Sequence, residues 1–153
     1  MRALELRIPP AVVVFLMGAG MWLASIALPS LAFSFPGRRI VAVALALAGG
    51  FVAVLGVTTF RRARTTVNPL TPQAASSLVT AGIYRFSRNP MYLGMLLLLA
   101  GAAVFLGNAG ALLLLPAFVV YMNQYQIKPE ERALSALFGS EFTAYLQRVR
   151  RWI

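Results

Sequence analysis

Hydrophobic residues form two long stretches in the first 60 residues of the chain, at positions 11–33 and 40–60. A helix needs about 20 mostly apolar residues to cross the hydrocarbon core of a bilayer. Neither stretch contains a charged residue, so the pattern predicts two membrane-spanning helices. The first apolar run is too long for a cleaved signal peptide, and we expect it to remain as a span.

Two further apolar runs follow at positions 91–106 and 111–127, separated only by Gly107, Asn108, Ala109 and Gly110. Such an interval is typical of a tight turn between antiparallel helices. Pro29 and Pro116 fall inside or near the ends of runs, where a kink is tolerated if neighbouring groups satisfy the freed carbonyl. We therefore predict an all-α, polytopic membrane protein with about four transmembrane helices.

The chain after the fourth run has the pattern of one more helix. Pro129 stands where a helix would begin, and Glu130 and Glu131 occupy its first turn. Apolar residues then recur at a spacing of three to four, namely Leu134, Leu137, Phe138, Phe142, Tyr145, Leu146, Val149 and Trp152. This spacing predicts an amphipathic cytosolic helix, broken at Gly139.

The overall composition supports a lipid environment. The 153 residues are 59% hydrophobic and 12% charged, with a mean hydropathy of +0.76. No ordinary soluble domain of this size would tolerate such a surface. The net charge of +10 is typical of the positive flanks of membrane spans, and we expect no nucleic acid partner.

The distribution of basic residues predicts the orientation in the membrane. With four spans, one side carries twelve of them: Arg2, Arg7, Arg61, Arg62, Arg64, Arg85, Arg88, Lys128, Arg132, Arg148, Arg150 and Arg151. The other side carries only Arg38 and Arg39. Because positive loops stay in the cytoplasm, we expect both termini to be cytoplasmic in a prokaryotic inner membrane.

Missing residue types narrow the chemistry. The chain has no cysteine, histidine or aspartate, and its acidic residues are Glu5, Glu130, Glu131 and Glu141. Disulfides, cysteine nucleophiles and cysteine-ligated metals are thereby excluded, and we expect no metal site. We also assign no residue as a dedicated catalytic acid or base.

Three polar groups fall at one predicted membrane face. They are positions 78–94, which extend from the central loop into the third apolar run, the cluster Tyr121, Asn123, Gln124, Tyr125 and Gln126, and the pair Glu130 and Glu131. The loop at 61–90 also contains Asn68, Pro69 and Pro72 and is longer than two helices need for their connection. Each group alone has a structural explanation: an aromatic belt, topology-determining arginines, or acidic residues at a helix N-terminus.

Together these groups carry a family resemblance. The matching residues are Ser76 to Thr80, Gly82, Tyr84, Arg88, Pro90, Tyr92 and Gly94, then a helical hairpin, then Glu130, Glu131, Leu134, Phe138, Gly139, Tyr145 and Val149. This ordered combination resembles the C-terminal catalytic region of isoprenylcysteine carboxyl methyltransferases. Related membrane methyltransferases acting on phospholipid head groups share a looser version. The resemblance covers about residues 76–150, half of the chain.

The resemblance implies an S-adenosylmethionine-dependent methyltransferase whose lipophilic substrate arrives from the bilayer. Residues 1–60 would then be two transmembrane helices, and residues 61–153 would form the cofactor-binding catalytic region. By similarity the cofactor contacts would come from Ser76, Ser77, Leu78, Val79, Tyr84, Asn89, Pro90, Met91, Tyr92 and Glu130. Substrate contacts would come from Gln126, Tyr121 and Arg88, while Glu131 would either contact the cofactor or brace the following helix.

The residue types agree with this implication. A sulfonium cation suits tyrosine rings, adenine suits an apolar slot, and an α-amino group suits a carboxylate. Two departures from the family pattern concern histidines, which commonly stand where this chain has Ser76 and Asn89. A third is Gln126, because prenylcysteine enzymes have an arginine there that pairs with the substrate carboxylate, and a neutral amide makes no such charged contact.

Three hypotheses about function therefore stand. The first is methyl transfer to a small lipophilic carboxylate or thiol, and the second is methyl transfer to the amine of a phospholipid. The third is a non-enzymatic membrane protein, such as a transporter or lipid-binding subunit. No ionisable side chain other than tyrosine lies inside the four predicted spans, which speaks against a proton-coupled transporter. The pattern predicts membrane lipids as partners and leaves the oligomeric state open.

Overall fold

The computed structural model describes residues 5–63 and 70–153. Its main helices are α1 (Pro10–Ala27), α2 (Arg38–Arg62), α3 (Pro90–Leu106), α4 (Ala109–Leu112), α5 (Leu114–Tyr121) and α6 (Lys128–Arg148). Four short pieces join them: η2 (Pro29–Leu31), η3 (Pro72–Ala74), η4 (Gly82–Arg85) and η5 (Met122–Ile127). The described residues contain no β-strand, which confirms the predicted all-α class. Arg2, Arg64, Asn68 and Pro69, used above for topology and loop length, lie outside the described residues.

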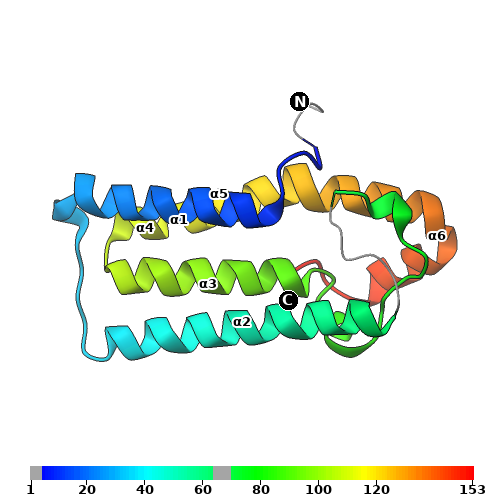
Figure 1. Ribbon diagram of the computed structural model, residues 1–153, viewed down its shortest axis with the longest axis horizontal. Coiled ribbons are helices and arrows are strands. Elements are labelled where there is room, and N and C mark those ends of the chain that lie inside the picture. Colours follow the sequence, from blue (N-terminus) through cyan, green and yellow to red (C-terminus); the bar gives the residue numbers. More distant parts are fainter. Residues whose placement is uncertain (1–4, 64–69) are drawn as a thin grey trace.

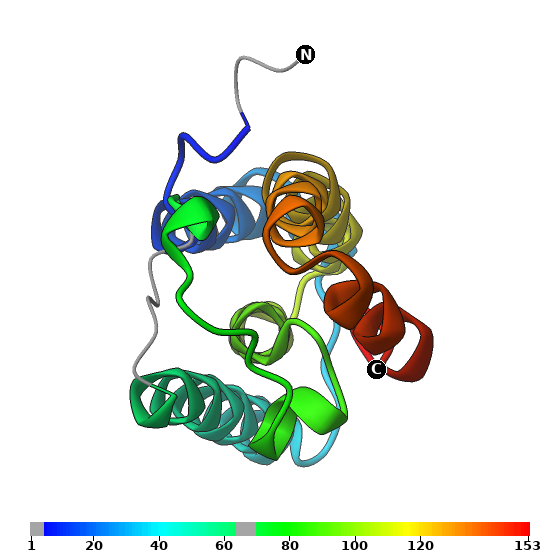
Figure 2. The same cartoon turned by 90° about the vertical axis from the view of Figure 1, so that its right-hand side faces the viewer.

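The helices form an elongated bundle with α3 between its neighbours (Figures 1 and 2). Helix α2 packs along one side of α3, and α1, α4 and α5 pack on the other. The central loop, α6 and the described N-terminal residues gather at one end of the bundle (Figure 1). Segments far apart in the sequence therefore meet there.

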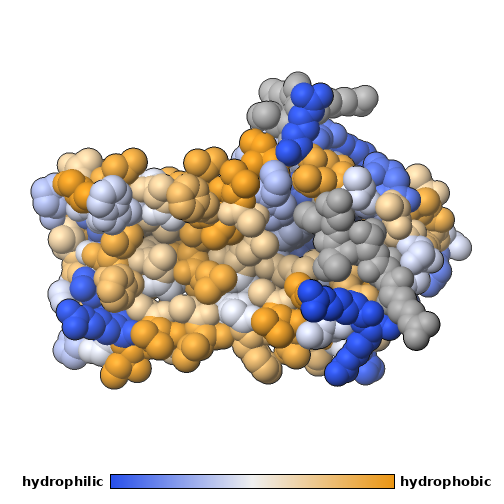
Figure 3. Space-filling view, viewed as in Figure 1, coloured by the Kyte–Doolittle hydropathy of each residue, from blue (hydrophilic) through white to orange (hydrophobic). Residues whose placement is uncertain are grey.

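Two helices are long and apolar enough to cross a membrane, α1 with 18 residues and α2 with 25. Helix α3 is equally apolar but has 17 residues. Large hydrophobic side chains are exposed along α1 and α2, for example Phe15, Trp22, Leu47 and Phe51. The long side of the molecule is accordingly mostly hydrophobic, with hydrophilic residues gathered toward its ends (Figure 3).

Small residues allow α2 and α3 to approach closely. A Cβ atom at Gly49 would lie 2.6 Å from the carbonyl oxygen of Gly94 and 2.9 Å from the amide nitrogen of Leu98. A Cβ atom at Gly101 would likewise lie 2.8 Å from the carbonyl oxygen of Ala42. In apolar surroundings, helices associate through such close van der Waals packing, and glycine makes the short distance possible.

The predicted tight turn between two antiparallel helices is confirmed. Gly107 ends α3 in the left-handed conformation, with φ of 63°. The side chain of Asn108 is buried; its oxygen accepts from the Gly110 amide at 2.8 Å, and its nitrogen donates to the Leu28 carbonyl at 2.8 Å. One amide thus caps the turn and ties it to the end of α1.

The first and fourth apolar runs differ from the predicted simple helices. Helix α1 stops at Ala27, and Pro29 starts a short 3₁₀ turn. In the fourth run the helix is interrupted at Leu113, three residues before Pro116, which has no amide hydrogen for the preceding turn. The chain then continues through the π-helical η5 into α6, which begins at Lys128 with Pro129, Glu130 and Glu131 in its first turn, as the sequence predicts. The predicted break at Gly139 is confirmed, with φ of 48° and ψ of −118°.

The α2–α3 contact leads to a test with neighbouring glycines. Gly49→Ala places a methyl group against backbone atoms of α3, and we expect a loss of about 1–3 kcal/mol in unfolding free energy, as for overpacked cores. Gly50→Ala is the matched control, because nothing lies within 4 Å of its Cβ position. Alanine in an open helical position stabilises by about 0.5–1 kcal/mol. Thermal unfolding in detergent measures the stability of both variants. Equal changes in stability for Gly49→Ala and Gly50→Ala would contradict the close approach of α2 and α3.

Candidate functional site

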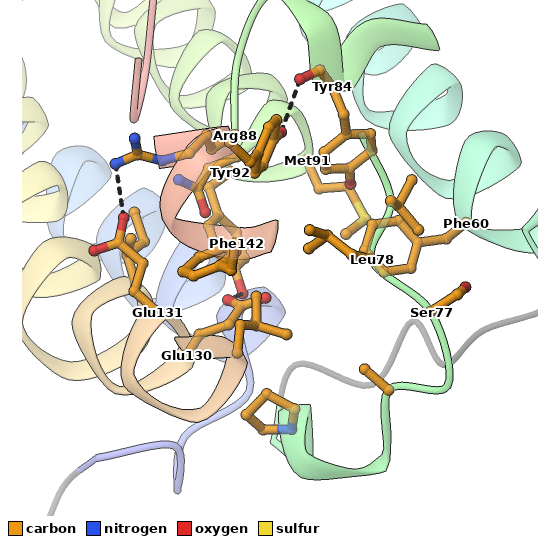
Figure 4. A pocket seen from close by; sticks show the side chains of 17 residues that line it. Phe60, Ser77, Leu78, Tyr84, Arg88, Met91, Tyr92, Glu130, Glu131 and Phe142 are labelled. Atoms are coloured by element: carbon orange, nitrogen blue, oxygen red, sulfur yellow. Dashed lines mark hydrogen bonds and ion pairs between the residues drawn. The ribbon is translucent and has the colours of Figure 1, made fainter. Parts of the chain in front are cut away.

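A cavity lies where the central loop, the start of α3 and α6 meet (Figure 4). Its lining is mostly apolar, with two carboxylates, one arginine and three tyrosines among the polar groups. The lining residues are Phe60, Pro72, Ala75, Ser77, Leu78, Val79, Tyr84, Arg88, Asn89, Met91, Tyr92, Ile127, Glu130, Glu131, Leu134, Phe142 and Tyr145.

Glu130 points into this cavity from the first turn of α6 (Figure 4). The hydroxyl of Tyr92 donates a hydrogen bond to its carboxylate at 3.1 Å, and the amide of Gln126 interacts with the same hydroxyl. Burial raises the pKa of Glu130 to about 7, the bond from Tyr92 opposes the rise, and the charge of Glu131 adds to it. Glu130 is therefore a carboxyl group that changes its charge near neutral pH.

Glu131 has a different environment from its neighbour. Its carboxylate accepts from Arg88 at 2.9 Å and from Arg151 at 3.1 and 2.7 Å, and it points away from Glu130 toward Arg88 (Figure 4). The hydrogen bond to Glu131 raises the pKa of Arg151 further. Two arginines thus share one carboxylate, while the described residues offer Glu130 no ion pair. This contact supports the bracing role considered for Glu131.

Arg88 and Asn89 tie the C-terminal segment to the start of α3. Arg88 donates through its side chain to the carbonyls of Leu146 at 3.0 Å and Val149 at 2.7 Å, and through its backbone to the carbonyl of Arg150 at 3.0 Å. Asn89 donates to the Arg151 carbonyl at 2.9 Å. The side chains of both residues therefore bind the protein itself, although both line the cavity.

Tyr84 enters the cavity from η4, where Phe60 of α2 packs edge-on against its ring at 5.1 Å. Tyr145 holds the backbone by donating to the Tyr84 carbonyl at 2.7 Å. Burial raises the pKa of Tyr84 far above its ordinary value, so its hydroxyl stays protonated. That hydroxyl is buried and has no hydrogen-bond partner among the described residues. An unsatisfied buried hydroxyl costs about 1–3 kcal/mol, which a ligand acceptor would recover.

The structure brings most of the predicted site residues together. Eight of the predicted cofactor residues line the cavity: Ser77, Leu78, Val79, Tyr84, Asn89, Met91, Tyr92 and Glu130. Ser76 and Pro90 do not line it, and Pro90 is buried in the first turn of α3. Of the predicted substrate residues only Arg88 lines the cavity, while Gln126 lies behind Tyr92 and Tyr121 packs on Tyr125 at 5.0 Å.

Sequence reasoning missed several wall residues. The apolar spacing assigns Phe142 and Tyr145 to the apolar face of the last helix, and in the structure both residues line the cavity. Phe60 stands at the end of an apolar run, where no local pattern distinguishes it from its neighbours. Its role follows only from the position of η4 against the last turns of α2.

A model of the phospholipid methyltransferase family matches residues 37–141, about two thirds of the chain. The chain belongs to the phospholipid methyltransferase family. It is similar to a probable protein-S-isoprenylcysteine O-methyltransferase of Oryza sativa subsp. indica, 31% identical over 112 residues that cover 71% of this chain and 57% of the rice protein. These matches confirm the family resemblance seen in the sequence.

Other relatives match shorter parts. Protein-S-isoprenylcysteine O-methyltransferase B of Arabidopsis thaliana is 35% identical over 72 residues, 47% of this chain and 36% of the plant protein. An uncharacterised protein of Haemophilus influenzae is 44% identical over 63 residues, 41% of this chain and 100% of that protein. The matched part thus spans little more than half of the plant methyltransferases at most. No solved structure matches the chain.

The unpaired state of Glu130 predicts a pH-dependent effect on stability. Its pKa is about 7 in the folded protein against an ordinary value of 4.5, so the folded state favours the neutral carboxyl. The contribution of neutral Glu130 to the unfolding free energy is complete below pH 4.5 and is lost as the pH rises through 7. Glu130→Gln has the size of the neutral carboxyl group and no charge. We expect its unfolding free energy to exceed that of the parent protein by about 1–3 kcal/mol at pH 8.5 and to equal it at pH 4.5.

Thermal unfolding at the two pH values measures this difference. Glu131→Gln is the matched control, because it removes the partner of Arg88 and Arg151 and should destabilise at pH 8.5. Exposed Glu141 is a second control, whose replacement by Gln should change little. A Glu130→Gln variant that is less stable at pH 8.5 than the parent protein would contradict the unpaired carboxylate.

Proposed function

We propose that the protein is an integral membrane methyltransferase that uses S-adenosylmethionine and acts on a lipophilic acceptor entering from the bilayer. The observation that carries the proposal is the cavity carboxylate of Glu130, which has a tyrosine but no cation beside it among the described residues. A carboxylate in an apolar, aromatic cavity favours a cationic ligand. Membership of a methyltransferase family supports the choice of that ligand.

The residues present fit the cofactor. Glu130 would hold its ammonium group, the unpartnered hydroxyl of Tyr84 would donate to one of its oxygens, and the ring faces of Tyr92 and Phe142 would border the sulfonium. Apolar walls such as Leu78 and Met91 would take the adenine. When bound, the cofactor supplies a methyl group activated by positively charged sulfur. The protein's own contribution is then to orient both reactants and to exclude water.

The membrane arrangement that we propose has four spans. Helices α1 and α2 are long enough, and α3 together with the α4–α5–η5 stretch would form the other two. The asymmetry of basic residues supports cytoplasmic termini and a cytoplasmic cavity in the inner membrane of a prokaryote. A C-terminal alkaline phosphatase fusion tests this orientation, and phosphatase activity outside the cytoplasm would contradict it.

For the acceptor we propose a lipophilic thiol or carboxylate. The thiol has the stronger support, because the one arginine in the cavity, Arg88, is already paired with Glu131 and with backbone carbonyls. A carboxylate acceptor would find no unpaired cation among the described lining residues. A thiol must lose its proton on methylation, and because the carboxylate of Glu130 would already hold the ammonium group of the cofactor, that proton would go to water.

A phospholipid amine is the second candidate. Its ammonium head group would have to lose a proton to water before methylation, since Glu130 would be engaged by the cofactor. The name of the matching family supports this candidate as well. Both candidates require an acceptor that carries a proton, which sets them apart from a preformed carboxylate.

Cofactor binding tests the central proposal. We expect the purified protein in detergent to bind S-adenosylmethionine or S-adenosylhomocysteine with a dissociation constant in the micromolar range, roughly −8 kcal/mol. As the pH rises toward 7, the affinity should increase about tenfold per pH unit, and above pH 7 it should stay constant, because the ionised carboxylate of Glu130 is the form that binds the cofactor. Calorimetry from pH 5.5 to pH 8.5 measures this profile.

Glu130→Gln should weaken binding about tenfold to a hundredfold and flatten the profile, because a charge-assisted hydrogen bond is worth about 1.5–3 kcal/mol. Glu141→Gln provides the control for a general loss of charge. Absence of heat and of thermal stabilisation at millimolar cofactor would refute the methyltransferase proposal. It would favour a non-enzymatic membrane protein instead.

A panel of acceptors decides between the acceptor classes. Protein in nanodiscs receives methyl-labelled S-adenosylmethionine together with a long-chain thiol, a long-chain carboxylic acid or phosphatidylethanolamine. We expect label in the thiol or the amine lipid, with the rate rising with pH through about 7. Transfer to the carboxylic acid alone, without this pH dependence, would contradict an acceptor that carries a proton.

A further inference from the structure

The N-terminal residues contact the π-helical turn that leads into α6. In this turn amides donate to the carbonyl five residues earlier, as Lys128 does to Asn123, and Pro129 has no amide hydrogen to continue the series. The carbonyl of Tyr125, in the same turn, accepts a hydrogen bond from the backbone amide of Leu6 at 3.0 Å. A residue near the start of the described chain is thus bonded to the backbone of this turn.

The N-terminal residues 5–8 are held at two further points. Glu5 forms an ion pair with Arg132 of α6, and Ile8 packs against the hydrophobic core. Leu6 itself has φ of 55°, a left-handed conformation that is unfavourable for a branched side chain. Such strain persists only where surrounding contacts over-determine it. The position of Leu6 over the Tyr125 carbonyl is therefore a specific feature of the fold.

The helical stretch under this segment carries two groups of the cavity. Gln126 and Glu130 both interact with the hydroxyl of Tyr92, from the turns on either side of Pro129. The residues before Pro129 are π-helical, a rare geometry that occurs mostly as single turns at functional sites. Pro129 also removes one amide donor from this stretch of backbone.

We propose that residues 5–8 hold this π-helical turn and thereby position Gln126 and Glu130 against Tyr92, which makes Glu5 and Leu6 positioning residues for the cavity. The inference rests on the proposed function only in treating Glu130 as the carboxylate that meets the ligand. Neither residue lines the cavity, so both act through the turn.

The environment of Glu130 provides a readout that needs neither cofactor nor acceptor. The chain has only four acidic residues, all glutamates, so carbon-13 labelling of glutamate gives four side-chain carboxyl signals, which substitutions can assign. The groups that face Glu130 are Tyr92 from α3, Tyr84 from η4, Glu131 and Tyr145 from α6, and Arg88, whose charge Glu131 pairs. None of them is changed by the variants below.

Leu6→Pro and Leu6→Gly form a matched pair. The proline variant loses the amide that binds Tyr125, while glycine keeps the amide and adopts positive φ without strain. Burial is the largest cause of the raised pKa of Glu130, so water that enters a loosened turn lowers it. We expect the NMR titration midpoint of Glu130 to fall by about one pH unit, tenfold in proton affinity, in Leu6→Pro and to stay in Leu6→Gly.

Glu5→Gln, which weakens the ion pair with Arg132, should lower the midpoint in the same direction, and Glu141→Gln should leave it unchanged. If Leu6→Pro fails to fold, the comparison of Glu5→Gln with Glu141→Gln decides. Midpoints equal to that of the parent protein in Leu6→Pro and Glu5→Gln would overturn the inference. A shifted midpoint in protein that binds no cofactor would keep the inference and refute the proposed function.

Discussion

The guanidinium of Arg88 connects the parts of the chain that surround the cavity. It reaches two carbonyls of the C-terminal segment and the carboxylate of Glu131, and its own backbone amide binds a third carbonyl. These contacts join the start of α3 to both ends of α6. Arginine suits this task because its planar fork carries several donors that keep their charge. Without it, the loop and the last helix would share few polar contacts among the described residues.

This arrangement determines the charge of the cavity. Arg88 and Arg151 both bind Glu131, so the charges of Arg88 and Glu131 are paired within the protein, while the buried Nε of Arg88 has no hydrogen-bond partner among the described residues. Glu130 is left with a tyrosine hydroxyl alone. Two adjacent residues of the same type therefore have different environments: Glu131 binds two arginines of the fold, and Glu130 faces the cavity without a cation beside it. A single-residue difference in position along α6 produces this division, since successive helical side chains point about 100° apart.

Much of the fold could be predicted from the sequence, because lipid exposure leaves a strong pattern. The apolar runs, the turn at Gly107 and the break at Gly139 all follow from local composition. The start of the last helix at Pro129 also follows from the local pattern. The π-helical turn before it could not be predicted, since no local pattern marks it and its backbone contact with Leu6 joins residues more than a hundred positions apart.

Most of the cavity residues expected to meet a cofactor could be predicted from the sequence, whereas the partners of these side chains could not. Residue types and order identified Tyr84, Tyr92 and Glu130, which do line one cavity. They gave no indication that Arg88 and Asn89 would bind the C-terminal backbone, because hydrogen bonds to carbonyls leave no side-chain pattern in a sequence. From the sequence alone, Arg88 and Asn89 therefore look like residues that contact a ligand, whereas in the structure they bind the C-terminal backbone. The cavity keeps a carboxylate with no cation beside it and two buried donors without partners among the described residues, the hydroxyl of Tyr84 and the Nε of Arg88, and unmet groups of this kind cost stability in the absence of a ligand.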